Sequence, residues 1–384
     1  MKRAWVFLLC AFSAGCAAVG TRTVPPGEPA MPQREAPSTS AYRVIYSFNG
    51  KKDARALVGG LAVSHGVLYG AAQQGGELGY GAVFGVTTQG KETALASLSA
   101  AETDPVGGPA ILGTTLYGGV WGGTNSGSEI YAGPLHGTLK IVHVNTLADL
   151  SEPGQAVALG GAIYGMLTGG VGGVFRYTPS GKYEVIHKFD QYLHDGVDPS
   201  YYLTAANGVL YGATCFGGDH DQGIVFSLSP SGSYKVIYAF KGGADGECPE
   251  GALTYSDGKL YGSTSGSAAP PSQPSGPAVG TLFSVTLAGK EAVIYRFKGV
   301  PNNDCQYFFT SLVVVKGDVY GVCYSGGYQN NGLLFRVTPS GKETILHAFA
   351  GGADGSAPQT IVRLGNSLYG ITNGGNGTVF SYAL

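Results

Sequence analysis

Charged side chains are scarce in this chain: only 12% of its 384 residues are Asp, Glu, Lys or Arg, and the formal net charge is −2. Such a surface has no basic field that would attract phosphate groups, so we expect no nucleic-acid partner. Long apolar runs are missing as well, and the apolar stretch at residues 4–12 is too short to cross a bilayer as a mature helix. Composition therefore argues against a nucleic-acid-binding protein.

Motifs of known catalytic sites are also missing. The sequence has no nucleophile elbow, no phosphate-binding loop, no H-E-x-x-H zinc motif and no aligned pair of catalytic carboxylates. We therefore predict no catalytic residues and no cofactor, apart from a divalent cation at one candidate site described below.

Glycine is abundant, with 65 residues, and it is accompanied by 24 tyrosines and 16 phenylalanines. Glycine favours tight turns and aromatic residues favour strands. An apolar residue followed by Tyr and Gly occurs seven times, with the tyrosines 48, 47, 47, 50, 59 and 49 residues apart. These tyrosines are Tyr69, Tyr117, Tyr164, Tyr211, Tyr261, Tyr320 and Tyr369. A fixed period in this range is typical of a repeat architecture.

Each repeat predicts four short strands. The first is an apolar run after Pro or Gly, and the second contains the Tyr-Gly triplet. The third carries an apolar-aromatic pair such as Val225-Phe226, and the fourth follows a Gly-bearing turn, as at residues 236–240. Strands that are apolar on both faces need cover on both sides, which stacked neighbouring sheets provide. The pattern favours an all-β fold, a β-propeller of four-stranded antiparallel blades.

The two ends of the repeat region predict that the propeller is closed. Residues 44–48 form a fourth-type strand that stands before any first strand, and residues 377–382 form a third-type strand with no fourth strand after it. The N-terminal strand would therefore complete the last blade, whereas an open array would need polar caps at both ends. We expect a closed ring of seven blades over residues 42–384.

The repeat resembles the GloVer tandem-repeat family, on the strength of an aromatic-rich fourth strand, an Asp-Gly-x-x-Pro loop, the Tyr-Gly triplet and the Gly-Gly loop. The clearest matches are residues 240–264 and 335–372, and residues 85–150 match weakly. This resemblance implies a propeller-like bacterial surface protein with one of several kinds of anchor. It implies no catalytic residues.

The N-terminus is typical of an exported protein. Residues 1–15 have a basic start and an apolar centre, which predicts a signal peptide. The small residues before Cys16 resemble a bacterial lipoprotein box, although Ser13 stands where leucine is usual, so secretion without a lipid stays an alternative. Cys16 would then carry a lipid anchor to the membrane, with the outer membrane or cell surface as the expected location and a secreted or periplasmic protein as the alternative. Residues 16–41 contain five prolines and predict an extended tether.

An acidic residue recurs in the loop before the first strand of every repeat. The positions are Asp53, Asp104, Asp149, Asp195, Asp245, Asp304 and Asp354. One interpretation is an acidic ring that binds cations or sugar hydroxyls. The favoured interpretation is that each Asp hydrogen-bonds to the backbone of its own tight turn, because a residue present in every repeat serves the repeat.

The fourth repeat departs from the others in having mixed imidazole and carboxylate groups in two loops of one face. These residues are His194, Asp195, Asp198, Asp219, His220 and Asp221. Such groups could hold a divalent metal ion, although no compact ligand spacing occurs, and solvated loop tips are the simpler interpretation. His187 and His347 occupy the fourth-strand position that tyrosines hold elsewhere, which predicts a packing role.

Four cysteines remain in the propeller region. An even number in an exported protein predicts disulfides, and three connectivities are open. Cys305 is expected to open a first strand and Cys323 to end the neighbouring second strand, which favours a Cys305–Cys323 pair and leaves Cys215–Cys248.

Three functions fit these observations. The leading one is a surface-anchored, non-catalytic binding or scaffold protein of the bacterial envelope, a monomer whose partner is an envelope protein or a glycan. The second is an extracellular carbohydrate-active or metal-assisted enzyme that uses the loop-rich face. The third is a purely structural envelope component.

Overall fold

The computed structural model describes a β-propeller built from seven four-stranded sheets, with an additional two-stranded sheet within the described residues. The described residues are 41–50, 53–98, 104–121, 128–135, 137–145, 152–190, 195–265, 280–299, 303–307 and 311–384. Residues 1–40, with the predicted signal peptide, Cys16 and most of the tether, lie outside them. No helix within the described ranges is long and apolar enough to cross a membrane.

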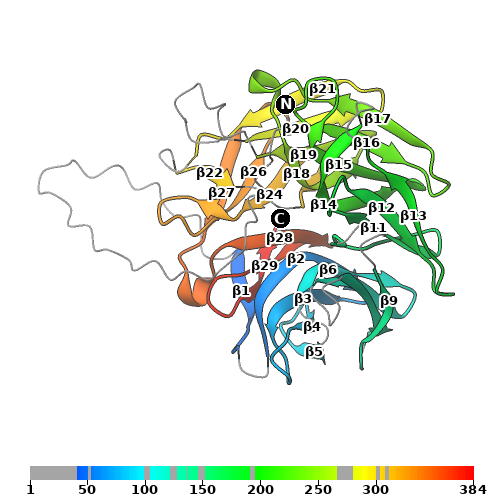
Figure 1. Cartoon of the computed structure of the whole chain (residues 1–384). Coiled ribbons are helices and arrows are strands. Elements are labelled where there is room, and N and C mark those ends of the chain that lie inside the picture. The colour runs from blue at the N-terminus through cyan, green and yellow to red at the C-terminus, as the bar shows by residue number, and fades with distance from the viewer. Residues whose placement is uncertain are drawn as a thin grey trace, which may run out of the picture. The chain divides into compact units, whose positions relative to one another are not determined.

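The blades follow one another along the chain, and each sheet begins with its first strand on the inner side (Figure 1). Blade 1 contains β2 (Ala54–Ser64), β3 (Val67–Gly75), β4 (Ala82–Thr87) and β5 (Glu92–Ser97). Blade 2 contains β6 (Pro105–Leu112), β7 (Thr115–Trp121), β8 (Ser128–Pro134) and β9 (Lys140–Val144). Blade 3 contains β10 (Val157–Leu159), β11 (Ala162–Leu167), β12 (Gly173–Tyr177) and β13 (Tyr183–Lys188). Blade 4 contains β14 (Gly196–Ala206), β15 (Val209–Gly217), β16 (Ile224–Leu228) and β17 (Tyr234–Ala239).

The remaining blades have the same order. Blade 5 contains β18 (Pro249–Ser256), β19 (Lys259–Thr264), β20 (Thr281–Thr286) and β21 (Glu291–Arg296). Blade 6 contains β23 (Val313–Val315), β24 (Asp318–Cys323), β26 (Leu333–Val337) and β27 (Glu343–Ala348). Blade 7 contains β28 (Pro358–Leu364), β29 (Ser367–Thr372), β30 (Thr378–Ala383) and β1 (Tyr42–Ser47). Two short 3-10 helices, η2 (Gly243–Asp245) and η4 (Gly352–Asp354), precede blades 5 and 7.

The ring is closed by the N-terminal strand, as the sequence predicted. Strand β1 pairs antiparallel with β30, with Tyr42 opposite Tyr382 and Ser47 opposite Thr378. Strand β1, from the start of the propeller, thus supplies the fourth strand of blade 7. This pairing joins the first and last parts of the propeller.

Blade 6 differs from the expected pattern because its first strand is divided. The sequence predicted that Cys305 opens this strand, but β22 (Cys305–Tyr307) pairs with β25 (Ser325–Gly326) in the separate two-stranded sheet. Pairing in blade 6 itself begins at β23. First strands of other blades are also irregular, as shown by the register shift between Pro199 and Leu203 in blade 4.

The Tyr-Gly triplets are packing elements of the second strands. In all seven blades the triplet glycine lies directly opposite the aromatic residue of the third strand, as Gly212 lies opposite Phe226. A Cβ atom at Gly212 would lie 2.5 Å from Phe226 Cζ, because the aromatic ring occupies the space above the glycine. The glycine is therefore required by the ring that covers it.

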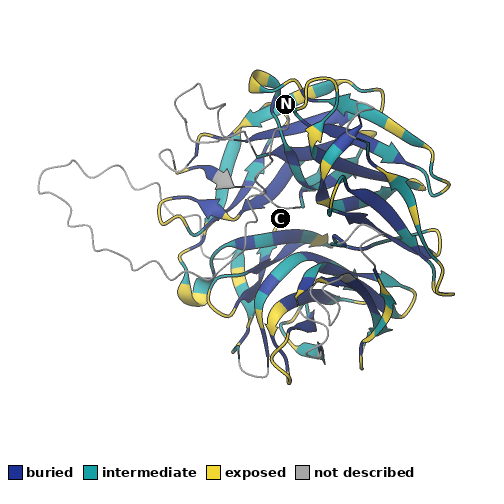
Figure 2. Cartoon of the chain, in the orientation of Figure 1, coloured by how far each residue is buried: buried dark blue, intermediate teal, exposed yellow. Residues whose placement is uncertain are grey.

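Aromatic pairs also join neighbouring blades. The phenylalanine that follows a fourth strand packs edge-on against the third-strand aromatic ring of the next blade, at centroid distances of 4.9–5.4 Å. These pairs are Phe48–Phe84, Phe189–Phe226, Phe240–Phe283, Phe297–Phe335 and Phe349–Phe380. Burial follows this pattern, with buried residues in the middle of the strands and exposed residues in the turns (Figure 2).

Candidate functional site: loop face and axial cavity

Two faces of the propeller have to be distinguished. We call the loop face the one that carries the connections from second to third strands and from each fourth strand to the next blade. We call the turn face the opposite one, which carries the tight turns between first and second and between third and fourth strands. Because all strand pairs within the blades are antiparallel, every blade presents its connections in the same way.

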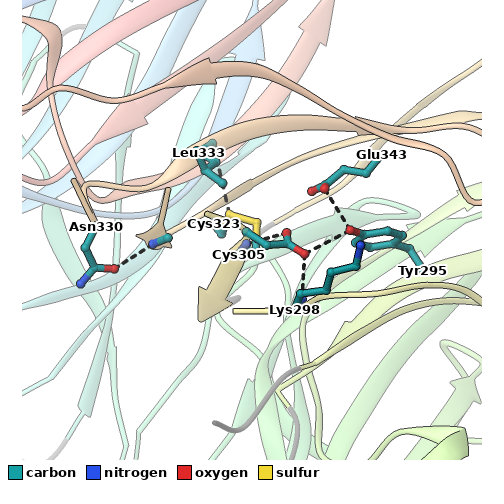
Figure 3. Close-up of a disulfide and its surroundings, with 9 residues drawn as sticks. Tyr295, Lys298, Cys305, Cys323, Asn330, Leu333 and Glu343 are labelled. Atoms are coloured by element: carbon teal, nitrogen blue, oxygen red, sulfur yellow. Dashed lines mark hydrogen bonds between the residues drawn. A yellow bond between two sulfur atoms is a disulfide. The ribbon is translucent and has the colours of Figure 1, made fainter. Parts of the chain in front are cut away.

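The aspartates of the predicted acidic ring are hydrogen-bonded within the protein. Asp304 is 3% exposed, and its Oδ2 accepts hydrogen bonds from Tyr295 Oη at 3.1 Å and from the Lys298 backbone N–H at 2.7 Å (Figure 3). Its Oδ1 accepts a third from the Cys305 backbone N–H at 2.7 Å. The same role is filled by Asp53, Asp195, Asp245 and Asp354. The turn-stabilising interpretation is confirmed for these five residues.

The other two aspartates of the series are not shown in this role. Asp104 stands directly before Pro105, has a backbone φ of 58° and lies exposed. It matches the pre-proline position of other blades, such as Asp198 before Pro199, rather than the turn position. Asp149 lies outside the described residues.

The donors to these aspartates follow a rule that the sequence analysis missed. Where the fourth strand supplies a tyrosine, a glutamate stands at the start of the next blade's fourth strand. Tyr295 Oη lies 2.9 Å from Glu343 Oε2, and Tyr46 Oη lies 3.1 Å from Glu92 Oε2, both within hydrogen-bond distance. We call each tyrosine or histidine, its aspartate and this third residue a latch. Each latch ties one blade to the next.

Where the fourth strand supplies a histidine, the third member is a tyrosine that stacks on the imidazole. His187 Nε2 lies 3.1 Å from Asp195 Oδ2, and its ring stacks on Tyr234 at 4.0 Å. His347 lies 3.0 Å from Asp354 Oδ2 and stacks on Tyr42 at 3.5 Å. The predicted packing role of the two histidines is thus only half of their function, since each also bonds to the loop aspartate.

The latch glutamates predict a pH-dependent stability. Burial and the neighbouring Asp245 and Asp304 carboxylates raise the pKa of Glu291 and of Glu343 to about 7, above the unfolded value of 4.5. The folded state therefore binds more protons than the unfolded state between these values, and stability falls as pH rises through this window. Both groups are partly exposed, so solvent screening limits the effect to a fall in Tm of about 3 °C between pH 6 and pH 8.

The double variant Glu291→Gln/Glu343→Gln is expected to reduce this pH dependence in thermal unfolding. A part of the same sign remains, because burial also raises the pKa of Glu250 to about 7. Burial lowers the pKa of His347, which has the opposite sign and acts only below its unfolded value of 6.5. A wild-type Tm that rises from pH 6 to pH 8, or an unchanged slope in the double variant, would contradict the assignment.

The five candidate metal ligands of the fourth repeat that the structure describes do not form a ligand cluster. Within the described part of the chain no three of Asp195, Asp198, Asp219, His220 and Asp221 bring ligand atoms within 4.8 Å of one another. Asp195 is engaged by His187, and Asp221 Oδ1 accepts a hydrogen bond from the Gly217 backbone N–H at 3.0 Å. His194 lies outside the described residues, so a cation site that includes it stays a prediction.

The two disulfides are Cys215–Cys248 and Cys305–Cys323, the pairing that the sequence favoured. Cys305 and Cys323, whose bond is drawn in Figure 3, are fully buried, whereas Cys215 and Cys248 are half-buried. Two disulfides indicate that the protein folds in an oxidising, extracellular type of environment.

A cavity of about 260 Å³ lies between the inner strands. Its lining comes from six blades and is mostly uncharged: Gly59, Gly60, Leu61, Gln155, Tyr202, Ala252, Ser311, Leu312, Val313, Gln359, Thr360, Ile361, Val362 and Arg363. Blade 1 contributes the bare backbone of Gly59 and Gly60. Blade 2 packs closely behind this backbone, because a Cβ at Gly108 would lie 1.8 Å from the Gly60 carbonyl oxygen. We call this the axial cavity.

The polar groups of the axial cavity are only partly satisfied by the protein. Ser311 Oγ donates to the Ile361 carbonyl at 2.9 Å and lies 2.6 Å from Thr360 Oγ1. Gln155 Oε1 is buried and accepts no hydrogen bond from any residue of the described ranges. Burial raises the pKa of Tyr202 to about 12, so its phenol stays neutral. The cavity thus offers hydroxyl and amide groups to a ligand without a net field.

Within the described ranges, the exposed aromatic side chains lie toward the loop face. They are Tyr80, Trp121, Tyr201, Phe216, Tyr324 and Tyr328, with exposures from 39% to 88%. The large exposed side chain on the turn face is Leu287, between β20 and β21, while Val142, Val144 and Val185 lie on outer strands. Neither the axial cavity nor this aromatic face was predicted. The sequence does carry a signal for the exposed aromatic residues. The position four or five residues after the triplet tyrosine is aromatic in some repeats, whereas in others it holds Gln73, Thr168, Ser265 or Asn373.

A family model described as the Gloeobacter/Verrucomicrobia repeat matches residues 151–382, more than half of the chain. The chain belongs to this family. The family match covers blades 3 to 6 and strands β28 to β30 of blade 7. Blades 1 and 2 lie outside it, and there Leu98 stands in place of the inter-blade phenylalanine. No curated protein matches the chain.

Solved structures show the same fold at low identity. The designed Ika8 protein is 12% identical, with a TM-score of 0.51 over 89% of this chain and 99% of its own. BamB from Moraxella catarrhalis is 15% identical, with a TM-score of 0.50 over 85% of this chain and 94% of its own. At this identity the likeness concerns the propeller fold alone, which hosts many unrelated functions.

Proposed function

We propose that this Gloeobacter/Verrucomicrobia-repeat protein is a non-catalytic binding protein of the bacterial envelope, and that its loop face binds a neutral glycan. The observation that carries this proposal is the gathering of the described exposed aromatic side chains on the loop face, together with a polar axial cavity in which Arg363 is the one charged lining residue. A lipid on Cys16 and the tether at residues 16–41 would hold this face away from the membrane surface.

The chemistry of the face fits a sugar better than a protein or a charged ligand. Sugar rings present C–H groups to aromatic faces and hydroxyls to amides and hydroxyls, and the loop face together with Gln155 and Ser311 supplies both kinds of contact. Arg363 is the one charged residue in the cavity lining, and its Nε–H already donates to the Gly365 carbonyl at 3.0 Å. An acidic polymer would find little to pair with.

Binding is tested by affinity electrophoresis in gels that contain neutral or acidic polysaccharides. Trp121→Ala and Tyr328→Ala should each weaken retention about tenfold, since stacking on an aromatic ring is worth about 1–3 kcal/mol for a nucleobase and we expect the lower end for a sugar. The control is Leu287→Ala on the turn face, which should change nothing.

Three outcomes contradict the proposal. The first is retention that loop-face variants and the Leu287→Ala control affect equally. The second is a preference for acidic over neutral polymers. The third is turnover of the bound polymer, which would favour the carbohydrate-active enzyme and move the function from binding to catalysis.

A further inference from the structure

One cluster of ligand-type side chains lies apart from the axial cavity and the latches. The sulfur atoms of Cys215 and Cys248 and a carboxylate oxygen of Glu250 lie within 4.8 Å of one another, on the loop face between blades 4 and 5. Glu250 Oε1 lies 3.3 Å from Cys248 Sγ. This is the one group of three metal-ligand side chains found in the described part of the chain. In the structure the two sulfurs form a disulfide.

We infer that reduction of Cys215–Cys248 creates a zinc-type metal site, with the two thiolates and the Glu250 carboxylate as ligands. Two sulfurs and one oxygen form a soft ligand set that zinc prefers, and three protein ligands leave a fourth position for water. The oxidised form is a poor ligand for the ion, because the sulfurs of a disulfide are neutral and the thiolate is the form that binds metals. The site is thus controlled by redox state and is independent of the proposed glycan binding.

The positions of the ligands do not depend on the disulfide. The Cys248 backbone N–H donates to the Gln222 carbonyl of blade 4 at 2.9 Å, and the Cys248 carbonyl accepts from the Ser265 N–H of blade 5 at 3.1 Å. Cys215 lies in β15 between Thr214 and Phe216, which pair with β14 at Pro199 and Val197. The backbone that carries the two thiols therefore stays in place after the bond is broken, and the sulfur atoms separate by side-chain rotation.

The surroundings of Glu250 favour a cation. Glu250 Oε2 is buried and accepts no hydrogen bond within the described ranges. The carboxylate therefore has an unused acceptor beside the two sulfurs, which a metal ion would occupy.

The two disulfides differ in access, which makes selective reduction possible. Cys305 and Cys323 have no exposed surface, while Cys215 and Cys248 are half-buried. A dithiol reductant attacks one sulfur through a mixed disulfide, and its second thiol then completes the exchange. Overall, the protein disulfide gains two electrons and two protons and the dithiol becomes a disulfide. Metal binding then releases the two thiol protons as the metal–sulfur bonds form.

The test is titration of the purified full chain with cobalt(II), before and after reduction by a phosphine and removal of the excess. We expect the thiolate-to-cobalt charge-transfer band to appear with one equivalent in the reduced protein, to be displaced by zinc, and to be absent in the oxidised protein. Cys215→Ser should abolish the band, and Glu250→Gln should weaken cobalt binding at least tenfold. The matched control is Glu247→Gln, an acid in the same loop that is outside the ligand set.

Alkylation of the reduced wild-type protein should abolish the cobalt band as Cys215→Ser does, because blocked thiols should bind no cobalt. The inference is overturned if the reduced protein shows no band or unfolds on reduction. It is equally overturned if binding survives alkylation, or if Glu250→Gln behaves like Glu247→Gln.

Discussion

Asp304→Ala is expected to lower the free energy of unfolding by about 3 kcal/mol, because it removes three hydrogen bonds from a nearly fully buried carboxylate. The Lys298 and Cys305 backbone N–H groups would lose their acceptor, and a buried unsatisfied donor costs about 1–3 kcal/mol. Tyr295 would keep its bond to Glu343, so part of the latch would remain. Urea unfolding of the purified protein measures this loss.

Two variants place the loss at the latch. Tyr295→Phe removes only the phenol and should cost about 1–1.5 kcal/mol. Asp318→Ala breaks a surface ion pair with Arg336, whose atoms are 3.5 Å apart, and should cost about 0.5 kcal/mol or less. If Asp304→Ala and Asp318→Ala destabilise the protein equally, the latch contributes nothing beyond an ordinary surface charge.

The period and the closure of the ring could be predicted because they depend on local patterns that every repeat shares. Each triplet glycine is set by the ring opposite it, as Gly370 is by Phe380, so the pattern survives as long as the blade does. Closure followed from counting strand types at the two ends of the chain. The pairing of β1 with β30 then needed no information about contacts between blades.

The latches could not be predicted because each joins residues from two blades. Tyr295 and Glu343 are 48 residues apart in the sequence. That a fourth-strand tyrosine pairs with a glutamate, and a fourth-strand histidine with a tyrosine, becomes visible only when the contacts of several blades are compared. From the sequence alone, His187 resembled a packing residue because an imidazole in a half-buried strand position gives no hint of its partner. The exposed aromatic residues of the loop face could not be predicted for a related reason. Whether a residue such as Tyr328 is exposed depends on where its loop lies in the fold, which the sequence alone does not show.

The joint between blades 1 and 2 shows how the fold tolerates the loss of a latch. The position of the donor is held by Ala96 in β5, and the inter-blade phenylalanine is replaced by Leu98. The inner strands compensate by close backbone contact, since a Cβ at Gly59 would lie 2.1 Å from Gly107 Cα. This is the part of the chain that matches the repeat weakly, and its packing is correspondingly different.

Gly212→Ala is expected to lower the free energy of unfolding by about 2–3 kcal/mol, although alanine is ordinarily the better strand residue. The added Cβ would lie 2.5 Å from Phe226 Cζ and 3.0 Å from Met166 Cε, so the ring has to move within a fully buried cluster. Backbone strain is not involved, because Gly212 has no positive φ. The cost is therefore steric and should be relieved by a smaller partner.

The double variant Gly212→Ala/Phe226→Leu tests this origin. Phe226→Leu alone should destabilise the protein by about 1–2 kcal/mol through the space it leaves, and Gly212→Ala should then fill part of that space. We expect the double variant to be more stable than the sum of the single losses by at least about 1 kcal/mol in urea unfolding. Additivity within about 0.5 kcal/mol would mean that the ring does not determine the glycine. The tyrosine-glycine pattern would then need an explanation outside the blade.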